Sequence, residues 1–117
     1  MGKRLHKVKR VAALRERHEL IPICPEQLGG LPTPRCPCQV SWTEDGPLIT
    51  ERGTGRCIVG KVDLTKAYIK GGEWSVWMAK VFDVKIAYML QNSPACDPVN
   101  GVAARALIAE GINVRRV

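Results

Sequence analysis

The stretch Lys85-Ile86-Ala87-Tyr88-Met89-Leu90 is an apolar run of strand length. Runs of this kind are typical of a parallel strand that is covered on both faces. Downstream, the sequence predicts a helix over residues 102–110, which ends at Gly111 as its C′ residue, and then a strand over 112–117. A strand, a helix and a second strand in this order predict a right-handed crossover and a parallel sheet.

Two further helices are predicted upstream of this unit. Apolar residues spaced three to four apart among Lys, Arg and Glu predict an amphipathic helix that ends near His18. The same periodicity predicts a second helix over 65–81, whose start we expect Gly71-Gly72 to delay. Trp74 and Trp77 lie on the apolar stripe of that helix, so we expect them to pack in the core and not to bind a cofactor.

The segment between these helices contains the weaker signals. Residues 20–24 are apolar and predict a short buried strand, although Pro22 removes a ladder donor and favours an edge position. From 25 to 60, five prolines exclude a long helix and leave short strands at most, around 40–42 and 56–59. A long ordered loop in so small a domain usually has a functional reason.

These elements predict an α/β protein, a Rossmann-like three-layer domain with a short, mostly parallel sheet. The 117 residues (12.9 kDa) suffice for one domain with one modest core. Hydrophobic residues make up 45% of the chain and charged residues 25%, which is the balance of a soluble globular protein. No apolar run is long enough to span a bilayer, and no hydrophobic signal segment follows the basic start, so we expect a cytoplasmic protein without a membrane partner.

The net charge of +7 is concentrated in the first predicted helix. Such a cluster of Lys and Arg could attract RNA or a phosphate-bearing ligand, whereas the simpler interpretation is a solvated helix face.

The chain also contains five cysteines, an odd number. In a cytosolic chain this indicates thiols in a reducing compartment, some of which bind metal or do chemistry.

Topology singles out two of these cysteines. In an open parallel sheet, ligands bind beyond the carboxyl ends of the strands, and Cys24 and Cys96 each follow a predicted strand. We therefore expect their thiols to lie in one cleft, where they could bind a metal or form a redox pair; the alternative is that both are small buried hydrophobes. A zinc site that uses Cys24, Cys36, Cys38 and Cys57 is less favoured, because paired CxxC motifs are missing. Scattered thiolates favour an iron–sulfur cluster.

A longer stretch carries a specific resemblance. Ile21-Pro22-Ile23-Cys24-Pro25-Glu26-Gln27-Leu28-Gly29-Gly30-Leu31-Pro32-Thr33-Pro34-Arg35 resembles, without gaps, the signature of the thiouracil desulfidase family. Asp63-x-Thr65, Asn92-Ser93-Pro94-x-Cys96 and Gly101-Val102-x-Ala104 followed by Gly111-Ile112 resemble its later motifs in the same order. Together these motifs cover nearly the whole chain.

The resemblance implies a [4Fe-4S] cluster held by three cysteines, with one iron open to the sulfur of a small thiolated nucleobase such as 2-thiouracil. By position, Cys24 and Cys96 match two of the ligands. Glu26 and Ser93 are the candidates for the proton-handling catalytic pair. Glu26 could instead cap a backbone amide, and Ser93 could instead make a local turn bond.

Two further positions fall in the same signature. Thr33 and Arg35 are candidates for shaping the substrate pocket, since Arg offers a bidentate fork to an anionic group. A plain salt bridge is the alternative for Arg35.

The chain also departs from the family pattern. Members normally open with a strand and a loop that supplies the first cysteine ligand, whereas this chain begins at what resembles the following helix. We therefore expect the first strand to be lacking, and Cys36 or Cys38 to take the third ligand position if the cluster is present in this short form. Cys57 is expected to be a bystander. A sheet edge left open by the missing strand predicts self-association as a homo-oligomer, or marginal stability.

A different class of function remains open at this point. The chain could be a cluster-less member of the family that acts as a binding or accessory domain, docking to RNA through the basic helix.

Overall fold

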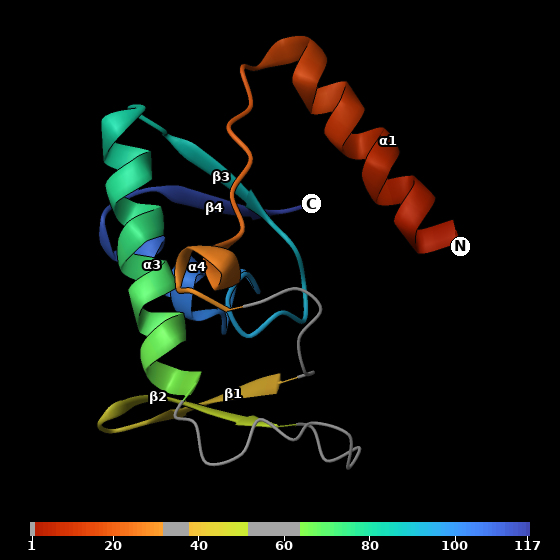
Figure 1. The fold of residues 1–117 in the computed structure, drawn as a ribbon. Helices are drawn as coiled ribbons and strands as arrows, with labels where there is room; N and C mark the ends of the chain where they lie inside the picture. Colours follow the sequence, from red (N-terminus) through yellow and green to blue (C-terminus); the bar gives the residue numbers. More distant parts are fainter. Residues whose placement is uncertain (1, 32–37, 52–63) are drawn as a thin grey trace.

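The computed structural model describes residues 2–31, 38–51 and 64–117. The elements in chain order are α1 (Gly2–Arg17), α2 (Pro25–Leu28), β1 (Cys38–Thr43), β2 (Gly46–Glu51), α3 (Leu64–Val81), β3 (Ile86–Met89), α4 (Val102–Ala109) and β4 (Asn113–Arg116). Figure 1 shows α3 running along the body, with the β1–β2 hairpin near its start and the β3–β4 pair near its end.

The described strands form two separate two-stranded sheets. β1 and β2 pair antiparallel, from Cys38 opposite Glu51 to Thr43 opposite Gly46. β3 and β4 pair parallel, from Ile86 opposite Asn113 to Met89 opposite Arg116, with α4 as the connection. The α/β class is thus confirmed, and so are the strand, helix and strand predicted around residues 85–117. The Rossmann-like, three-layer form of the fold stays a prediction.

The main core lies where α3 and α4 meet the parallel pair. It is built from small and aliphatic side chains on α3, α4 and β3 and just before β4: Ala79, Met89, Ala103, Ala104, Leu107 and Ile112. The end of α4 is fixed by a Schellman motif, in which the N–H of Ile112 donates to the carbonyl of Leu107 and the N–H of Gly111 to that of Ile108. Gly111 has the positive φ of 81° that this motif requires, which confirms its predicted role as the C′ residue.

The sequence suggested that Gly71-Gly72 would delay the start of this helix. That prediction is wrong, because α3 begins at Leu64. A Cβ at Gly71 would overlap the carbonyl oxygen of Pro25, whereas a Cβ at Gly72 would meet the Cα of Ala103 at 3.4 Å. The two glycines therefore let neighbouring elements approach α3 closely, and packing outweighs their low helix propensity.

The expectation that the tryptophans pack in the core is wrong. Trp74 is 43% exposed and Trp77 is 55% exposed. The face of α3 that is buried consists mainly of small residues and Tyr68, so the bulky apolar residues lie on the opposite, outer face.

Residues 20–24 were predicted to be a strand, but in the structure they belong to no helix or strand, and the backbone of Cys24 is extended. Pro22 has no N–H to give to a ladder, which explains part of this result. A groove of about 490 Å³ has Leu20, Ile21 and Ile23 and the residues of β3 in its lining, together with residues of α1, α3 and α4. Within the described ranges, the edge of β3 that faces away from β4 has no strand partner.

The hairpin was only half foreseen. β1 contains the strand predicted at 40–42, but β2 was not predicted, and the strand predicted at 56–59 lies outside the described residues. The turn is Glu44-Asp45, followed by Gly46 at a φ of 118°, and Asp-Gly is a turn signal that the sequence did carry.

The predicted amphipathic first helix is confirmed as α1, which projects from the body in Figure 1. The Arg10 guanidinium donates to the carbonyl oxygen of Arg116 at 3.5 Å, and Val8 and Val11 are exposed. Across the part of the chain that the structure describes, none of the helices has the length and apolar character needed to cross a membrane.

Candidate functional site

The candidate site is centred on Tyr68, a side chain of α3 that is 2% exposed. Its hydroxyl donates a 2.6 Å hydrogen bond to Oε1 of Glu26, in the first turn of α2. Cys24 occupies the N-cap position of that turn, with an extended backbone, and Pro25 follows at the first helical position. The hydrogen bond therefore ties the cysteine-bearing segment to the long helix.

Two glycines bring α2 and α3 together at this point. A Cβ at Gly29 would overlap the carbonyl oxygen of Ala67, just as one at Gly71 would overlap that of Pro25. Because both positions lack a side chain, the backbones of α2 and α3 come into direct contact. This contact places Glu26 within reach of Tyr68.

The loop from β3 to α4 supplies Ser93 and Cys96. Oγ of Ser93 accepts hydrogen bonds from the backbone N–H groups of Ala95 and Cys96, both at 3.2 Å. The local turn bond considered for Ser93 is therefore present. A hydroxyl has one proton to donate and two lone pairs to accept with, so these two bonds leave the Ser93 proton for a third partner.

Asp97 shapes the rest of this loop. Its carboxylate accepts hydrogen bonds from the backbone N–H groups of Asn92 at 2.8 Å and of Val99 and Asn100 at 3.0 Å each. These bonds, that from Asn92 most strongly, lower the pKa of Asp97 below its ordinary value of 3.8, although burial partly opposes the shift. The aspartate that stands here therefore organises the loop that carries Cys96.

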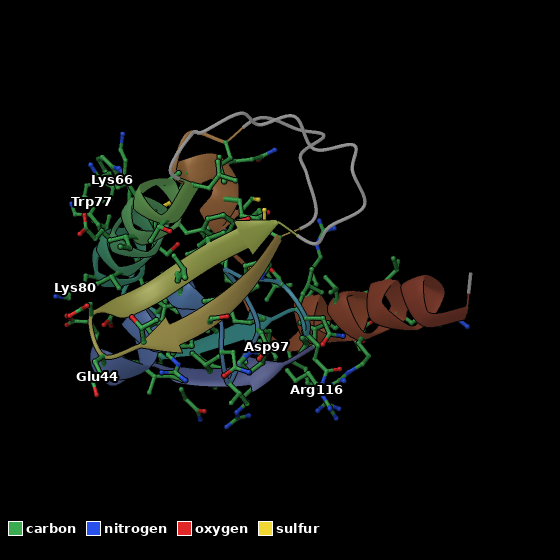
Figure 2. The ribbon with its side chains drawn as sticks, turned by 90° about the horizontal axis from the view of Figure 1, so that it is seen from below. Glu44, Lys66, Trp77, Lys80, Asp97 and Arg116 are labelled. Atoms are coloured by element: carbon green, nitrogen blue, oxygen red, sulfur yellow. The ribbon has the colours of Figure 1, made fainter. Side chains whose placement is uncertain are left out.

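The hairpin closes the site from another side. Cys38, at the start of β1, is 6% exposed and lies in one hydrophobic cluster with Tyr68, Ala95 and Val102, against which Cys96 also packs. Nε1 of Trp42 donates a 2.7 Å hydrogen bond to the carbonyl oxygen of Asn100, and the Arg105 guanidinium lies 4.0 Å from the centre of the Trp42 ring. Figure 2 shows the hairpin in front of the loop that carries Asp97.

The structure thus gathers some of the predicted residues around Tyr68. Glu26 bonds to it, and Cys96 packs on its cluster. Cys24 lies on the same short segment as Glu26; the convergence of Cys24 and Cys96 in one cleft stays a prediction, as do the catalytic roles of Glu26 and Ser93. Four predicted residues lie outside the described residues: Thr33, Arg35, Cys36 and Cys57.

One residue of the site was missed, since Tyr68 gave no signal beyond its place in a predicted helix. Cys38 was expected as one of two candidates for the third ligand position, and the structure places it in the Tyr68 cluster, whereas Cys36 lies outside the described residues.

The described residues do not by themselves form a complete metal centre. Cys24, Cys38 and Cys96 are present as thiols. Nowhere in 2–31, 38–51 or 64–117 do three Cys, His, Asp or Glu side chains gather into a group that could hold a metal ion. A three-cysteine cluster therefore does not fit the described residues alone, and Cys36 and Cys57 are the remaining thiols of the chain.

Comparison with known proteins identifies the family. The sequence model of the 2-thiouracil desulfurase family matches residues 2–116. The chain belongs to this family. The resemblance noted in the sequence is thereby confirmed over almost the entire chain.

Two known proteins resemble this chain. The uncharacterised protein YbbK of Bacillus subtilis (strain 168) is 26% identical over 89 residues, which cover 75% of this chain and 58% of YbbK. The chain thus spans little more than half the length of that relative. Among solved structures, the [4Fe-4S]-dependent thiouracil desulfidase TudS matches with a TM-score of 0.67 and 23% identity, covering 91% of this chain and 72% of TudS. At that identity the likeness supports the fold alone.

Proposed function

We propose that this protein removes sulfur from a thiolated pyrimidine such as 2-thiouracil. Family membership over residues 2–116 supports this reaction class. The observation that carries the proposal is the Tyr68–Glu26 hydrogen bond, which holds a carboxylate on the same segment as Cys24 and beside the cluster that Cys96 packs against. Oriented carboxylates next to thiol-bearing loops suit a hydrolytic reaction in which protons must be moved.

The proposed reaction is a net hydrolysis. The oxygen of water forms a bond to the carbon of the C=S group, the carbon–sulfur bond breaks, and the sulfur leaves as hydrosulfide. The product from 2-thiouracil is uracil. Two protons are relocated, no electrons are gained or lost overall, and no oxidant or reductant is required.

In this proposal Glu26 takes the proton of the attacking water. A general base must be held in a defined place to be effective, and the Tyr68 hydroxyl fixes one of its oxygens. Ser93 assists the leaving group. Since two backbone N–H groups occupy its lone pairs, its hydroxyl is disposed to donate a hydrogen bond to the departing sulfur.

We also propose that the reaction depends on a [4Fe-4S] cluster, with Cys24 and Cys96 as two ligands and Cys36 or Cys38 as the third. When bound, such a cluster supplies an open iron that polarises the carbon–sulfur bond as a Lewis acid. Cys38 shares the Tyr68 cluster with Cys96, but Cys24, Cys38 and Cys96 do not gather as placed, so a ligand set with Cys38 requires these segments to move when the cluster binds. Cys36, two residues earlier, lies outside the described residues.

Substrate binding is assigned to Thr33 and Arg35 in the same proposal. We further propose that the protein is cytoplasmic and that its fold is a Rossmann-like, three-layer domain.

The proposal is tested by incubating anaerobically reconstituted protein with 2-thiouracil and following uracil and sulfide in equal amounts. Uracil itself serves as the blank. We expect Glu26→Gln and Ser93→Ala to reduce uracil formation at least about 100-fold. Stoichiometric conversion by a Glu26→Gln variant as fast as by the unaltered protein would contradict the assigned base.

A second function, RNA binding, is favoured by one observation. α1 projects from the body and presents exposed Lys9, Arg10, Arg15 and Arg17. In this alternative, binding weakens steeply with added salt and survives Cys24→Ser and Cys96→Ser. Binding that does not depend on salt would contradict it.

A further inference from the structure

The outer face of α3 carries a stripe of exposed side chains at three-to-four-residue spacing, which we call the α3 stripe: Lys66, Ile69, Lys70, Glu73, Trp74 and Trp77. Its apolar members are 38% (Ile69), 43% (Trp74) and 55% (Trp77) exposed. The two indole rings contact each other edge to face, with centroids 5.5 Å apart and planes at 81°. Figure 2 shows Lys66 and Trp77 on the side of α3 that faces away from the body.

This stripe has the composition of an interface. Aromatic residues are enriched at protein–protein interfaces, and two tryptophans beside an isoleucine form an apolar centre with charged residues around it. Exposed contiguous apolar surface is unfavourable in a monomer in water. The three charged side chains of the stripe make no ion pair with another described residue.

The order of residues along the stripe makes it complementary to itself. We consider two α3 helices packed antiparallel about a twofold axis that passes between positions 71 and 72. Lys70 then lies opposite the partner's Glu73, and Ile69 lies opposite the partner's Trp74. Lys66 lies opposite the partner's Trp77, where an ammonium group can rest on an indole face. By symmetry each of these pairs occurs twice.

We propose that the α3 stripe is a dimer interface between two copies of this chain. Each copy contributes the same patch, as a twofold dimer requires, and both its apolar and its charged residues find complementary partners. A stable interface buries about 800 Å² per partner, which is more than one helix face of six residues supplies. We therefore expect a reversible dimer with a Kd on the order of 10 μM. This interface is distinct from the open edge of β3.

Charge exchange tests the pairing directly, with sedimentation velocity as the measurement. Lys70→Glu places glutamate opposite glutamate, and Glu73→Lys places lysine opposite lysine, so each variant alone should be monomeric at about 100 μM, well above the expected Kd. An equimolar mixture of the two variants should form heterodimers, because both charge pairs are then restored in reversed sense. The double variant Lys70→Glu/Glu73→Lys should form homodimers again.

Apolar contact is tested by Trp77→Glu, which should also abolish the dimer. Leu48→Glu is the matched control, since Leu48 is 49% exposed on β2 outside the stripe, and it should leave the dimer intact. Circular dichroism checks that each variant is folded.

Three results would overturn the proposal. They are an unaltered protein that is monomeric up to about 1 mM, a dimer that tolerates Trp77→Glu, and single-charge variants whose mixture stays monomeric. If a monomeric protein instead binds a single-stranded oligonucleotide and Trp77→Glu abolishes that binding, the stripe is a base-stacking surface and the dimer proposal is wrong.

Discussion

The Tyr68 hydroxyl and the Glu26 carboxylate are joined by a 2.6 Å hydrogen bond, although 42 residues separate them in the chain. The bond links α3 to the short segment that contains Cys24. Because the glycine contacts between α2 and α3 leave little freedom to that segment, the carboxylate has a defined position. Tyr68 is therefore a positioning residue for Glu26.

Tyr68→Phe should separate positioning from packing. The ring is kept and only the hydroxyl is lost, so we expect the free energy of unfolding in urea to fall by about 1–3 kcal/mol, as for a hydrogen bond to a charged group. The rate of uracil formation should fall by a larger factor than the affinity for 2-thiouracil. Tyr88→Phe is the control, because it removes the same hydroxyl from a half-buried tyrosine on β3, and both quantities should stay within error. A Tyr68→Phe variant as active as the unaltered protein would show that Glu26 needs no positioning.

Gly71→Ala and Gly72→Ala should have opposite effects, though the two residues are adjacent. The new methyl group at 71 would overlap the Pro25 carbonyl, so α2 must move and the free energy of unfolding should fall by about 2 kcal/mol or more. At 72 the methyl group finds ordinary contact with Ala103, and the gain in helix propensity of up to about 1 kcal/mol should leave the protein unchanged or slightly more stable. Urea unfolding of the two variants measures the difference. Equal destabilisation would contradict the close approach of α2 to position 71.

The stability that Asp97 contributes should depend on pH. Its pKa is lowered in the folded protein, chiefly by the bond from the Asn92 N–H, so its contribution is complete above the unfolded value of 3.8 and is lost as pH falls through the lower folded value. In Asp97→Asn, an NH₂ group takes the place of one carboxylate oxygen. Depending on the orientation of the amide, the variant loses either the hydrogen bond from Asn92 or the two bonds from Val99 and Asn100. We expect this variant to unfold at a lower temperature at pH 7, by an amount that shrinks below about pH 4.

Melting curves of both proteins between pH 3 and 7 check this expectation. Asp45→Asn, on the exposed turn of the hairpin, is the control and should show no such trend. A deficit of Asp97→Asn that is constant across the range would mean that charge plays no part.

The cysteines should divide by function. We expect Cys24→Ser and Cys96→Ser each to abolish iron retention after anaerobic reconstitution and desalting, since each removes a ligand thiolate. Cys57→Ser should retain as much iron as the unaltered protein. Comparison of Cys36→Ser with Cys38→Ser identifies the third ligand. If iron fell as far for Cys57→Ser as for Cys24→Ser, the proposed ligand set would be wrong.

The helices were predictable because their signals are local. Apolar spacing in α1, α3 and α4, and the glycine at 111, depend on residues within a few turns of each other. The parallel pair followed from the run at 85–90 for the same reason. The signature at 21–35 also identified the family, and with it Cys24 and Glu26 as candidates.

The features that were missed depend on tertiary contacts. By helix propensity, Gly71-Gly72 predicts a break in the helix. Their actual effect is to let α2 and α4 approach α3 closely, and these contacts between distant segments cannot be read from the local sequence. Trp74 and Trp77 have the right periodicity for a core, yet the small residues of α3 face inward and leave them outside. The role of Tyr68 depends on its hydrogen bond to Glu26, 42 residues away in the sequence.

One measurement tests the central claim most directly, namely the iron, acid-labile sulfide and uracil obtained from the same anaerobically reconstituted sample. The account predicts about four irons and four sulfides per chain, for one [4Fe-4S] cluster, and conversion of 2-thiouracil to uracil that is lost in Cys24→Ser together with the iron. A colourless protein that retains no iron on desalting and releases no sulfide from 2-thiouracil would contradict it.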